Sequence, residues 1–128
     1  MKSTRLDVTQ AEPQVVRCYL YARTARSNAL AIERQIQDGH ALAESLSSQG
    51  ARHEVVRVFQ DDGGSGLSGD RPGYTAMLAG LERGEATVVV VWGEERLYRD
   101  ANLQKAYSEM SDRLGVTTHS VRSGRVGR

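Results

Sequence analysis

Four consecutive valines, Val88–Val91, followed by Trp92, restrict the fold of this chain more than any other feature of its sequence. A run that is β-branched and apolar at every position is typical of a strand buried on both faces, as in a parallel sheet covered by helices. Such a strand delivers the residues that follow it to the carboxyl edge of the sheet, where open α/β sheets bind ligands. We therefore expect a functional site directly after Trp92.

The residues after this strand are charged and closely spaced. Glu94, Glu95, Arg96 and Arg99 lie on a predicted loop that turns into a helix. Arg96 and Arg99 are three residues apart and are expected on the same side of a helical turn. Their guanidinium groups suit bidentate binding of phosphate, and a helix amino terminus adds attraction for an anion. An exposed helix start with surface salt bridges would show the same pattern, so other segments must decide between the two interpretations.

Predicted strands and helices alternate along the chain. Apolar and β-branched runs predict strands at 15–21, 54–59, 88–92 and 116–121, and helical spacing predicts helices at about 29–48, 71–83 and 99–113. This order indicates an α/β fold: a single domain with a mostly parallel sheet of about four strands and helices on both faces. We place the domain at 15–124, between a flexible arm at 1–14 and a basic tail at 125–128, and we expect no element from Ser123 onward.

The connections between these elements also carry predictions. Residues 22–28 are expected to form a short polar turn, with Ser27 or Asn28 capping the first helix. Asp70 is predicted to cap the second helix ahead of Pro72. The glycine-rich stretch 60–73 is expected to be a mobile, functional loop. The third helix is expected to bury the apolar residues Leu103, Tyr107, Met110 and Leu114.

Charge and cysteine content exclude several classes of protein. The formal net charge is +1, so an anion site has to come from arginines gathered by folding. Cys18 is the only cysteine, which excludes an internal disulfide and a cysteine-based zinc site, and we expect a buried thiol. The histidines lack metal-ligand spacing, and no cofactor is predicted. There is no apolar run of membrane-spanning length and no signal-peptide segment, so we expect a cytoplasmic protein.

Three predicted loops bring arginines to one edge of the sheet. Arginines gathered from separate loops repel each other unless a shared anion compensates, and each charged hydrogen bond to that anion contributes about 1.5–3 kcal/mol. Arginine rather than lysine favours geometric binding of a phosphodiester. Asp61 or Glu95 could orient a guanidinium group or transfer a proton. The three loops carry Arg23 and Arg26, then Asp61 and Arg71, then Glu95, Arg96 and Arg99.

Four short motifs occur in order along residues 15–124. They are Tyr21-Ala22-Arg23, then Phe59 with Asp61, Gly63, Ser65 and Gly66, then Asp70-Arg71-Pro72-Gly73, and finally Val91-Trp92 with Arg96-Leu97 and Arg99. Together they resemble the catalytic domain of the serine recombinases, the family of resolvases, invertases and large serine integrases. The family patterns are Y-x-R, F-x-D-x-G-x-S-G, D-R-P-G and V-W-x-x-D-R-L-x-R.

The resemblance implies chemistry on DNA without a metal or nucleotide. In the family, a serine attacks a phosphodiester and becomes joined to the 5′ end of the DNA, and the subunits of a tetramer exchange and reseal the ends. The matching positions imply that Arg23, Arg71, Arg96 and Arg99 bind the scissile phosphate and stabilise its transition state. The acidic position falls on Glu95, where the family usually has aspartate.

Two further DNA contacts are predicted outside these motifs. Arg122 and Arg125 lie in the basic carboxyl-terminal part of the chain and are expected to touch DNA phosphates, although a solvated tail has the same composition. The family forms dimers and tetramers, and we expect such pairing to be weak in this chain. No membrane partner is expected.

Ala25 stands where the family has its nucleophilic serine. An alanine has no oxygen with which to attack a phosphorus atom. Three explanations are open: an engineered serine-to-alanine change, a natural homologue that has lost catalysis, or use of Ser27 as the nucleophile. Loss of a nucleophile lowers the rate by a factor on the order of 10⁶ in a well-studied hydrolase.

Three classes of function follow. The first is a recombinase catalytic domain that is inactive because of Ala25. The second is a non-catalytic DNA-binding or regulatory module that keeps the phosphate site. The third is a flavodoxin-like binder of phosphate or nucleotides that uses the glycine-rich loop, although that loop lacks the G-x-G-x-x-G and Walker spacings.

Overall fold

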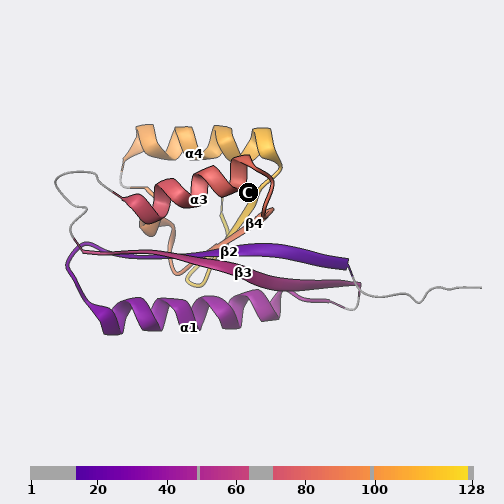
Figure 1. Cartoon of the computed structure of the whole chain (residues 1–128), viewed down its shortest axis with the longest axis horizontal. Helices are drawn as coiled ribbons and strands as arrows, with labels where there is room; N and C mark the ends of the chain where they lie inside the picture. Colours follow the sequence, from indigo (N-terminus) through magenta and orange to yellow (C-terminus); the bar gives the residue numbers. More distant parts are fainter. Residues whose placement is uncertain (1–13, 49, 64–70, 99, 127–128) are drawn as a thin grey trace, which may run out of the picture.

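The computed structural model describes residues 14–48, 50–63, 71–98 and 100–126. In these ranges the strands form one sheet in the order β3-β2-β4-β5-β6. Helix α1 covers one face of this sheet, and α3 and α4 cover the other (Figure 1). The elements are β2 (Gln14–Thr24), α1 (Ala29–Ser45), β3 (Ala51–Asp62), α3 (Pro72–Glu82), β4 (Val88–Val91), η1 (Glu94–Arg96), α4 (Ala101–Leu114), β5 (Thr117–Ser120) and β6 (Gly124–Arg125).

The four-valine strand is the centre of this sheet, as the sequence predicts. All four residues of β4 are buried, and the strand pairs in parallel with β2 on one side and β5 on the other. Strand β3 lies in parallel outside β2, so four strands run in the same direction. The predicted α/β class, with a mostly parallel sheet between helices, is confirmed.

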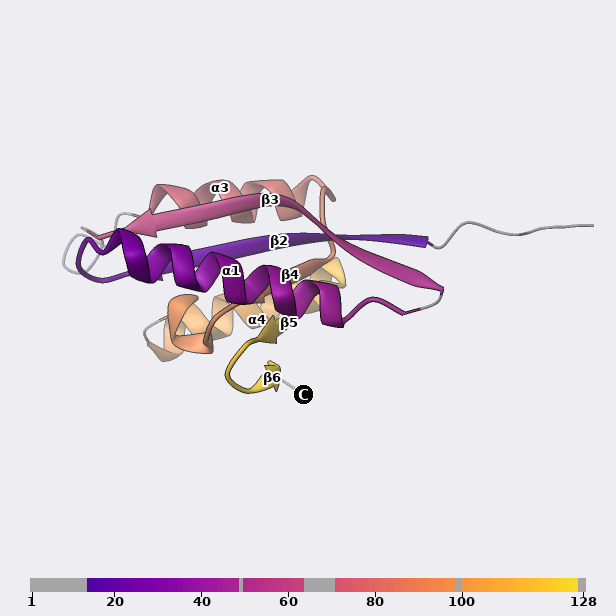
Figure 2. The same cartoon turned by 90° about the horizontal axis from the view of Figure 1, so that it is seen from below.

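Alternate residues of β2 divide the core into two layers. Tyr19 and Tyr21 face α3 and α4, where they pack with Phe59 and Met77. Cys18 belongs to the smaller layer under α1, and burial raises the pKa of its thiol to about 11. The expectation of a buried cysteine is therefore confirmed. Figure 2 shows α1 lying across the face opposite α3 and α4.

The turn expected at 22–28 is shorter, because β2 continues through Thr24. The last two residues of β2 remain in parallel register with β3, where Arg23 pairs with Asp61 and Thr24 with Asp62. The Thr24 hydroxyl also donates to the Asp62 carboxylate at 2.8 Å. Polar side chains are stable in this strand end because both their backbone and their side-chain groups find partners.

The carboxyl-terminal tail contains an element that the sequence analysis missed. Gly124–Arg125 forms β6, which pairs antiparallel with His119 and Ser120, so the prediction of no structure from Ser123 onward is wrong. Gly124 has a φ of 81°, a left-handed conformation that glycine adopts without strain and that reverses the chain here.

Two predictions about the helices also need correction. Leu103 is 37% exposed, because α4 is much longer than the four-residue strands beneath it and its first turn extends past them. Arg71 rather than Asp70 occupies the cap position of α3 and makes no side-chain cap bond; Asp61 instead accepts the first-turn amides of this helix. Of the two residues predicted to cap α1, Ser27 and Asn28, the cap is Asn28, whose side chain accepts from the Ala31 amide.

Some expectations fall outside the described residues. They are residues 1–13 of the arm predicted at 1–14 and most of the glycine-rich loop, at 64–70. The last residue assigned to that arm, Gln14, is instead the first residue of β2. Among the helices that the structure describes, none combines the length and the apolar character needed to cross a bilayer.

A buried tyrosine and a surface ion pair make the stability depend on pH. Tyr19 donates a hydrogen bond to Glu85, which also accepts from Arg83 at 2.8 Å. These bonds lower the pKa of Glu85 from 4.5 to about 2, and the bond from Arg83 has the larger effect. A carboxyl whose pKa is lowered by folding stabilises the fold at pH values above its pKa in the unfolded chain. That contribution disappears as the pH falls toward 2. In denaturant titrations the difference in stability between the unaltered protein and E85Q should therefore be largest near neutral pH and vanish near pH 2; a constant difference would contradict this.

Candidate functional site

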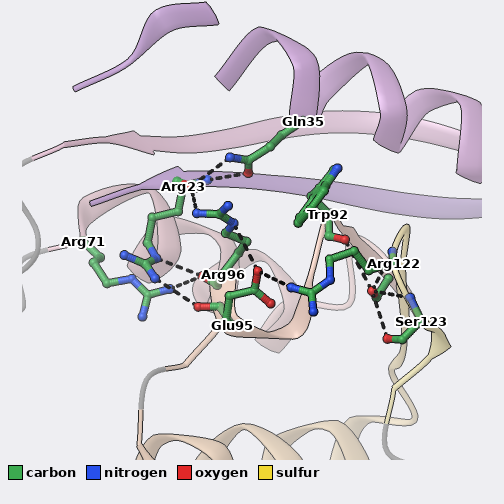
Figure 3. A network of polar contacts seen from close by, with 9 residues as sticks. Arg23, Gln35, Arg71, Trp92, Glu95, Arg96, Arg122 and Ser123 are labelled. Carbon is green, nitrogen blue, oxygen red and sulfur yellow. Dashed lines mark hydrogen bonds and ion pairs between the residues drawn. The ribbon is translucent and has the colours of Figure 1, made fainter. Parts of the chain in front are cut away.

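Three arginines from separate segments meet at the carboxyl edge of the sheet (Figure 3). Arg23 lies near the end of β2, Arg71 directly precedes α3, and Arg96 ends the single turn η1 that follows β4. Arg23 and Arg71 are 6% and 7% exposed, whereas the Arg96 side chain is 27% exposed. The structure thus brings together three of the four arginines predicted for the phosphate site.

Backbone carbonyl groups hold these guanidinium groups in place. The Arg96 carbonyl oxygen accepts from Arg23 Nε at 3.1 Å and from Arg71 Nη2 at 2.9 Å. Arg23 Nη2 donates to the Glu95 carbonyl at 3.0 Å, and Arg96 Nη1 donates to the Arg23 carbonyl at 3.2 Å. Because a carbonyl group is neutral, these bonds orient the arginines without cancelling their charge. A guanidinium group held by carbonyl groups can still donate further hydrogen bonds to an anion.

Tyr21 connects Arg71 to a buried acid. Its hydroxyl accepts from Nε and Nη2 of Arg71, both at 3.2 Å, and donates to Asp61 Oδ2 at 2.6 Å. Asp61 is 5% exposed and also accepts from the amides of Gly73 and Tyr74. Burial, and then the bond to Asp61, raise the pKa of the Tyr21 phenol, which keeps it protonated as a donor. Of the two roles predicted for Asp61, the geometry matches orientation of a guanidinium group.

Gln35 belongs to this site although the sequence analysis did not single it out. It lies on α1, is 4% exposed, and brackets the backbone of Arg23: its Oε1 accepts from the amide and its Nε2 donates to the carbonyl, both at 3.0 Å. A glutamine on a helix face gives no sequence signal of this kind, because the pairing depends on how α1 lies against β2.

The Glu95 carboxylate lies between Arg122 and Arg96 and forms an ion pair with each. The distance from Arg122 Nη1 to Glu95 Oε2 is 2.9 Å, whereas Arg96 Nε lies 3.7 Å from the same oxygen. Arg96 Nε is buried and has no hydrogen-bond partner among the described residues. The carboxylate also folds back over Gly93, where an added Cβ would lie 2.5 Å from Oε1.

The loop between β2 and α1 contains Ala25, which is exposed. Asp62 holds both ends of this loop, since it accepts from the Thr24 hydroxyl and from the Asn28 amide at 2.7 Å. The bond from the Asn28 amide, followed by those from the hydroxyls of Thr24 and Ser27, lowers the pKa of Asp62. Asp62 is therefore a carboxylate and a weak base at neutral pH.

The remaining predicted residues lie elsewhere. Arg99 is outside the described residues, and α4 begins only at Ala101, so its expected helical neighbourhood with Arg96 is not described. Arg26 is exposed in the loop after β2. Arg125 is exposed in β6. Among the described residues, no group of three or more His, Cys, Asp or Glu side chains could hold a metal ion.

Comparison with known proteins agrees with this arrangement. The catalytic domain of ISC1926 TnpA, an IS607-like serine recombinase, is 28% identical, with a TM-score of 0.70; the match covers 83% of this chain and 70% of that one. The catalytic domain of TP901-1 integrase (20% identity, TM-score 0.69, 84% and 78% covered) and a resolvase family site-specific recombinase from Streptococcus pneumoniae (21%, 0.71, 87% and 76%) share the fold.

No curated protein sequence matches this chain. The family model described as "Resolvase, N terminal domain" matches residues 18–126. This match spans most of the chain, and the protein therefore belongs to the resolvase family through its N-terminal, serine recombinase catalytic domain.

Proposed function

We propose that this domain binds a backbone phosphate of DNA between Arg23, Arg71 and Arg96, with Arg99 as a fourth contact. The observation that carries the proposal is the set of neutral carbonyl acceptors that hold the three described guanidinium groups. These acceptors carry no net charge, and they hold three cationic groups close together although like charges repel. A phosphodiester is negatively charged and accepts hydrogen bonds from several guanidinium groups at once.

We propose further that the domain, as its sequence stands, binds DNA without cleaving it. Ala25 follows Arg23 by two residues, at the family's nucleophile position, and a methyl group cannot attack phosphorus. Ser27 is a poor substitute, because it lies two residues beyond the family's nucleophile position, next to Asn28, whose amide is bound by Asp62 at 2.7 Å. An engineered change and a natural loss of activity both remain compatible with this role.

Asp61 and Glu95 have different parts in the proposal. Asp61 orients Arg71 through Tyr21 and is assigned no proton transfer. Of the two acids, Glu95 has an exposed carboxylate beside the arginines. In a version of this domain that has a serine at position 25, we therefore assign proton transfer to Glu95. Contacts of Arg125 with neighbouring phosphates and pairing between subunits remain predictions.

A regulatory module that binds DNA beside active recombinases is the second candidate, and Ala25 favours it. Such a module needs the phosphate site but no nucleophile. The two candidates differ in whether a serine at position 25 would restore cleavage. A nucleotide binder of the flavodoxin type would instead be stabilised against heat by nucleotides more than by short duplex DNA.

Fluorescence anisotropy with a labelled duplex tests the phosphate site. We expect R96A to lower DNA affinity at least tenfold, since one charged contact contributes about 1.5–3 kcal/mol. The slope of log affinity against log salt concentration should fall by about one. The control is R34A, which removes the same charge from an exposed position on α1. Equal losses in the two variants would contradict a specific phosphate site.

A further inference from the structure

Arg122 is held rigidly beside the site, although it lies outside the four short motifs described above. The turn after β5 is tied to the end of β4, because the amides of Val121 and Arg122 donate to the carbonyls of Val91 and Trp92. Ser120, which is 1% exposed, accepts from the amides of Arg122 and Ser123, both at 3.1 Å. These bonds fix the backbone from which the Arg122 side chain extends.

The Arg122 guanidinium occupies a defined place between two partners. It stacks on the Trp92 ring, 5.4 Å from its centroid, and its Nη1 donates to Glu95 Oε2 at 2.9 Å. The Arg122 and Glu95 side chains are 56% and 47% exposed. Exposed ion pairs contribute little to folding, so the main consequence of this pair is the position in which it holds the Glu95 carboxylate.

That position matters because Glu95 has a second cation within reach. Arg96 stacks on the same indole, 5.6 Å from the ring centroid, and its buried Nε lies 3.7 Å from Glu95 Oε2 without a hydrogen bond. If Arg122 were absent, a small rotation would bring the carboxylate onto Arg96. The two groups already form an ion pair at 3.7 Å. A carboxylate at hydrogen-bonding distance would also occupy the Nε donor and offset more of the charge that the proposed phosphate site requires.

We infer that Arg122 is a positioning residue that holds the Glu95 carboxylate beyond hydrogen-bonding distance of Arg96 and so keeps Arg96 available for a DNA phosphate. The inference rests on the proposed function, since it concerns the affinity of that same site. It assigns Arg122 a task different from the direct phosphate contact expected from the sequence. The two tasks differ in one respect: only the first depends on the presence of a carboxylate at position 95.

A double-mutant cycle on the full chain separates them, with duplex DNA affinity as the readout. We expect R122A to lower affinity about tenfold in the Glu95 background but less than about twofold in the E95Q background, a coupling typical of residues in contact. R122K should restore most of the loss, because Arg122 uses one nitrogen toward one oxygen. Thermal unfolding of each variant shows that the comparison is made on folded protein.

The chain offers a matched control pair at the other ends of the helices. Arg113 on α4 and Glu82 on α3 form an ion pair of 2.7 Å with side chains 58% and 48% exposed. R113A and E82Q repeat the same charge changes, and we expect no coupling between them in DNA affinity. Their cycle corrects the first one for non-specific charge effects.

The outcomes distinguish the inference from the function on which it rests. A loss in R122A that is the same with Glu95 and in the E95Q background would overturn the positioning role and assign Arg122 to a direct DNA contact. If the unaltered chain binds DNA and R96A weakens that binding, the proposed function survives this result. Absence of DNA binding by the unaltered chain would overturn both.

Discussion

The variant A25S should form a covalent adduct with DNA, whereas the unaltered chain should form none. A serine at position 25 supplies the missing hydroxyl two residues after Arg23, and loss of a nucleophile lowers rates by a factor on the order of 10⁶. The family chemistry joins the serine to the 5′ end of the cut strand, so the label must be on the 3′ end. We would incubate a pool of 3′-labelled duplexes with each protein and look for a labelled protein band on a denaturing gel.

Two further variants show which groups form the adduct. Adding R96A to A25S should abolish the adduct, because the phosphate site would be weakened, whereas adding S27A should leave it intact. An adduct formed by the unaltered chain and removed by S27A would place the nucleophile at Ser27 instead. If A25S binds DNA as tightly as the unaltered chain but forms no adduct, the domain is a regulatory module and not a catalytic domain that lacks one oxygen atom.

Of the variants proposed here, the replacement of Asp61 with alanine should cause the largest loss of stability. This buried carboxylate accepts from the Tyr21 hydroxyl and from two first-turn amides of α3, at Gly73 and Tyr74. Each buried donor left without an acceptor costs about 1–3 kcal/mol. We therefore expect D61A to lower the free energy of unfolding by about 3 kcal/mol or more, measured by denaturant titration.

Graded variants test the cause of that loss. The variant D61N keeps one acceptor oxygen and should lose less stability than D61A. The variant E109A removes an acid from an exposed position of α4 and should change stability by less than about 0.5 kcal/mol. If D61A were as stable as E109A, Asp61 would not be the residue that joins β3, α3 and Arg71.

The architecture and the meeting of the arginines were predictable because both depend on periodicity. The uninterrupted Val88–Val91 run could only be a central strand, and alternating elements in a parallel sheet bring every strand end to one edge. Arg23 lies near the end of one such strand, and Arg71 and Arg96 come after two others, so their convergence needs no knowledge of side-chain contacts.

The details of the site were not predictable, because they depend on how elements pack rather than on their order. The role of Gln35 requires a particular position of α1 along β2. The pairing of Glu95 with Arg122 requires the turn after β5 to reach the end of β4. The exposure of Leu103 follows from the relative lengths of α4 and the strands beneath it. Local sequence carries no signal for any of these three.

The contact between Gly93 and Glu95 implies that these two positions evolve together. Gly93 has an extended backbone, with a φ of −153°, so the chain path does not require glycine; an added Cβ would instead displace the Glu95 carboxylate folded over it. An aspartate at position 95 is one methylene shorter and would not reach that space. Homologues with the shorter acid should therefore accept larger residues at position 93, while glutamate should keep its present position only beside glycine.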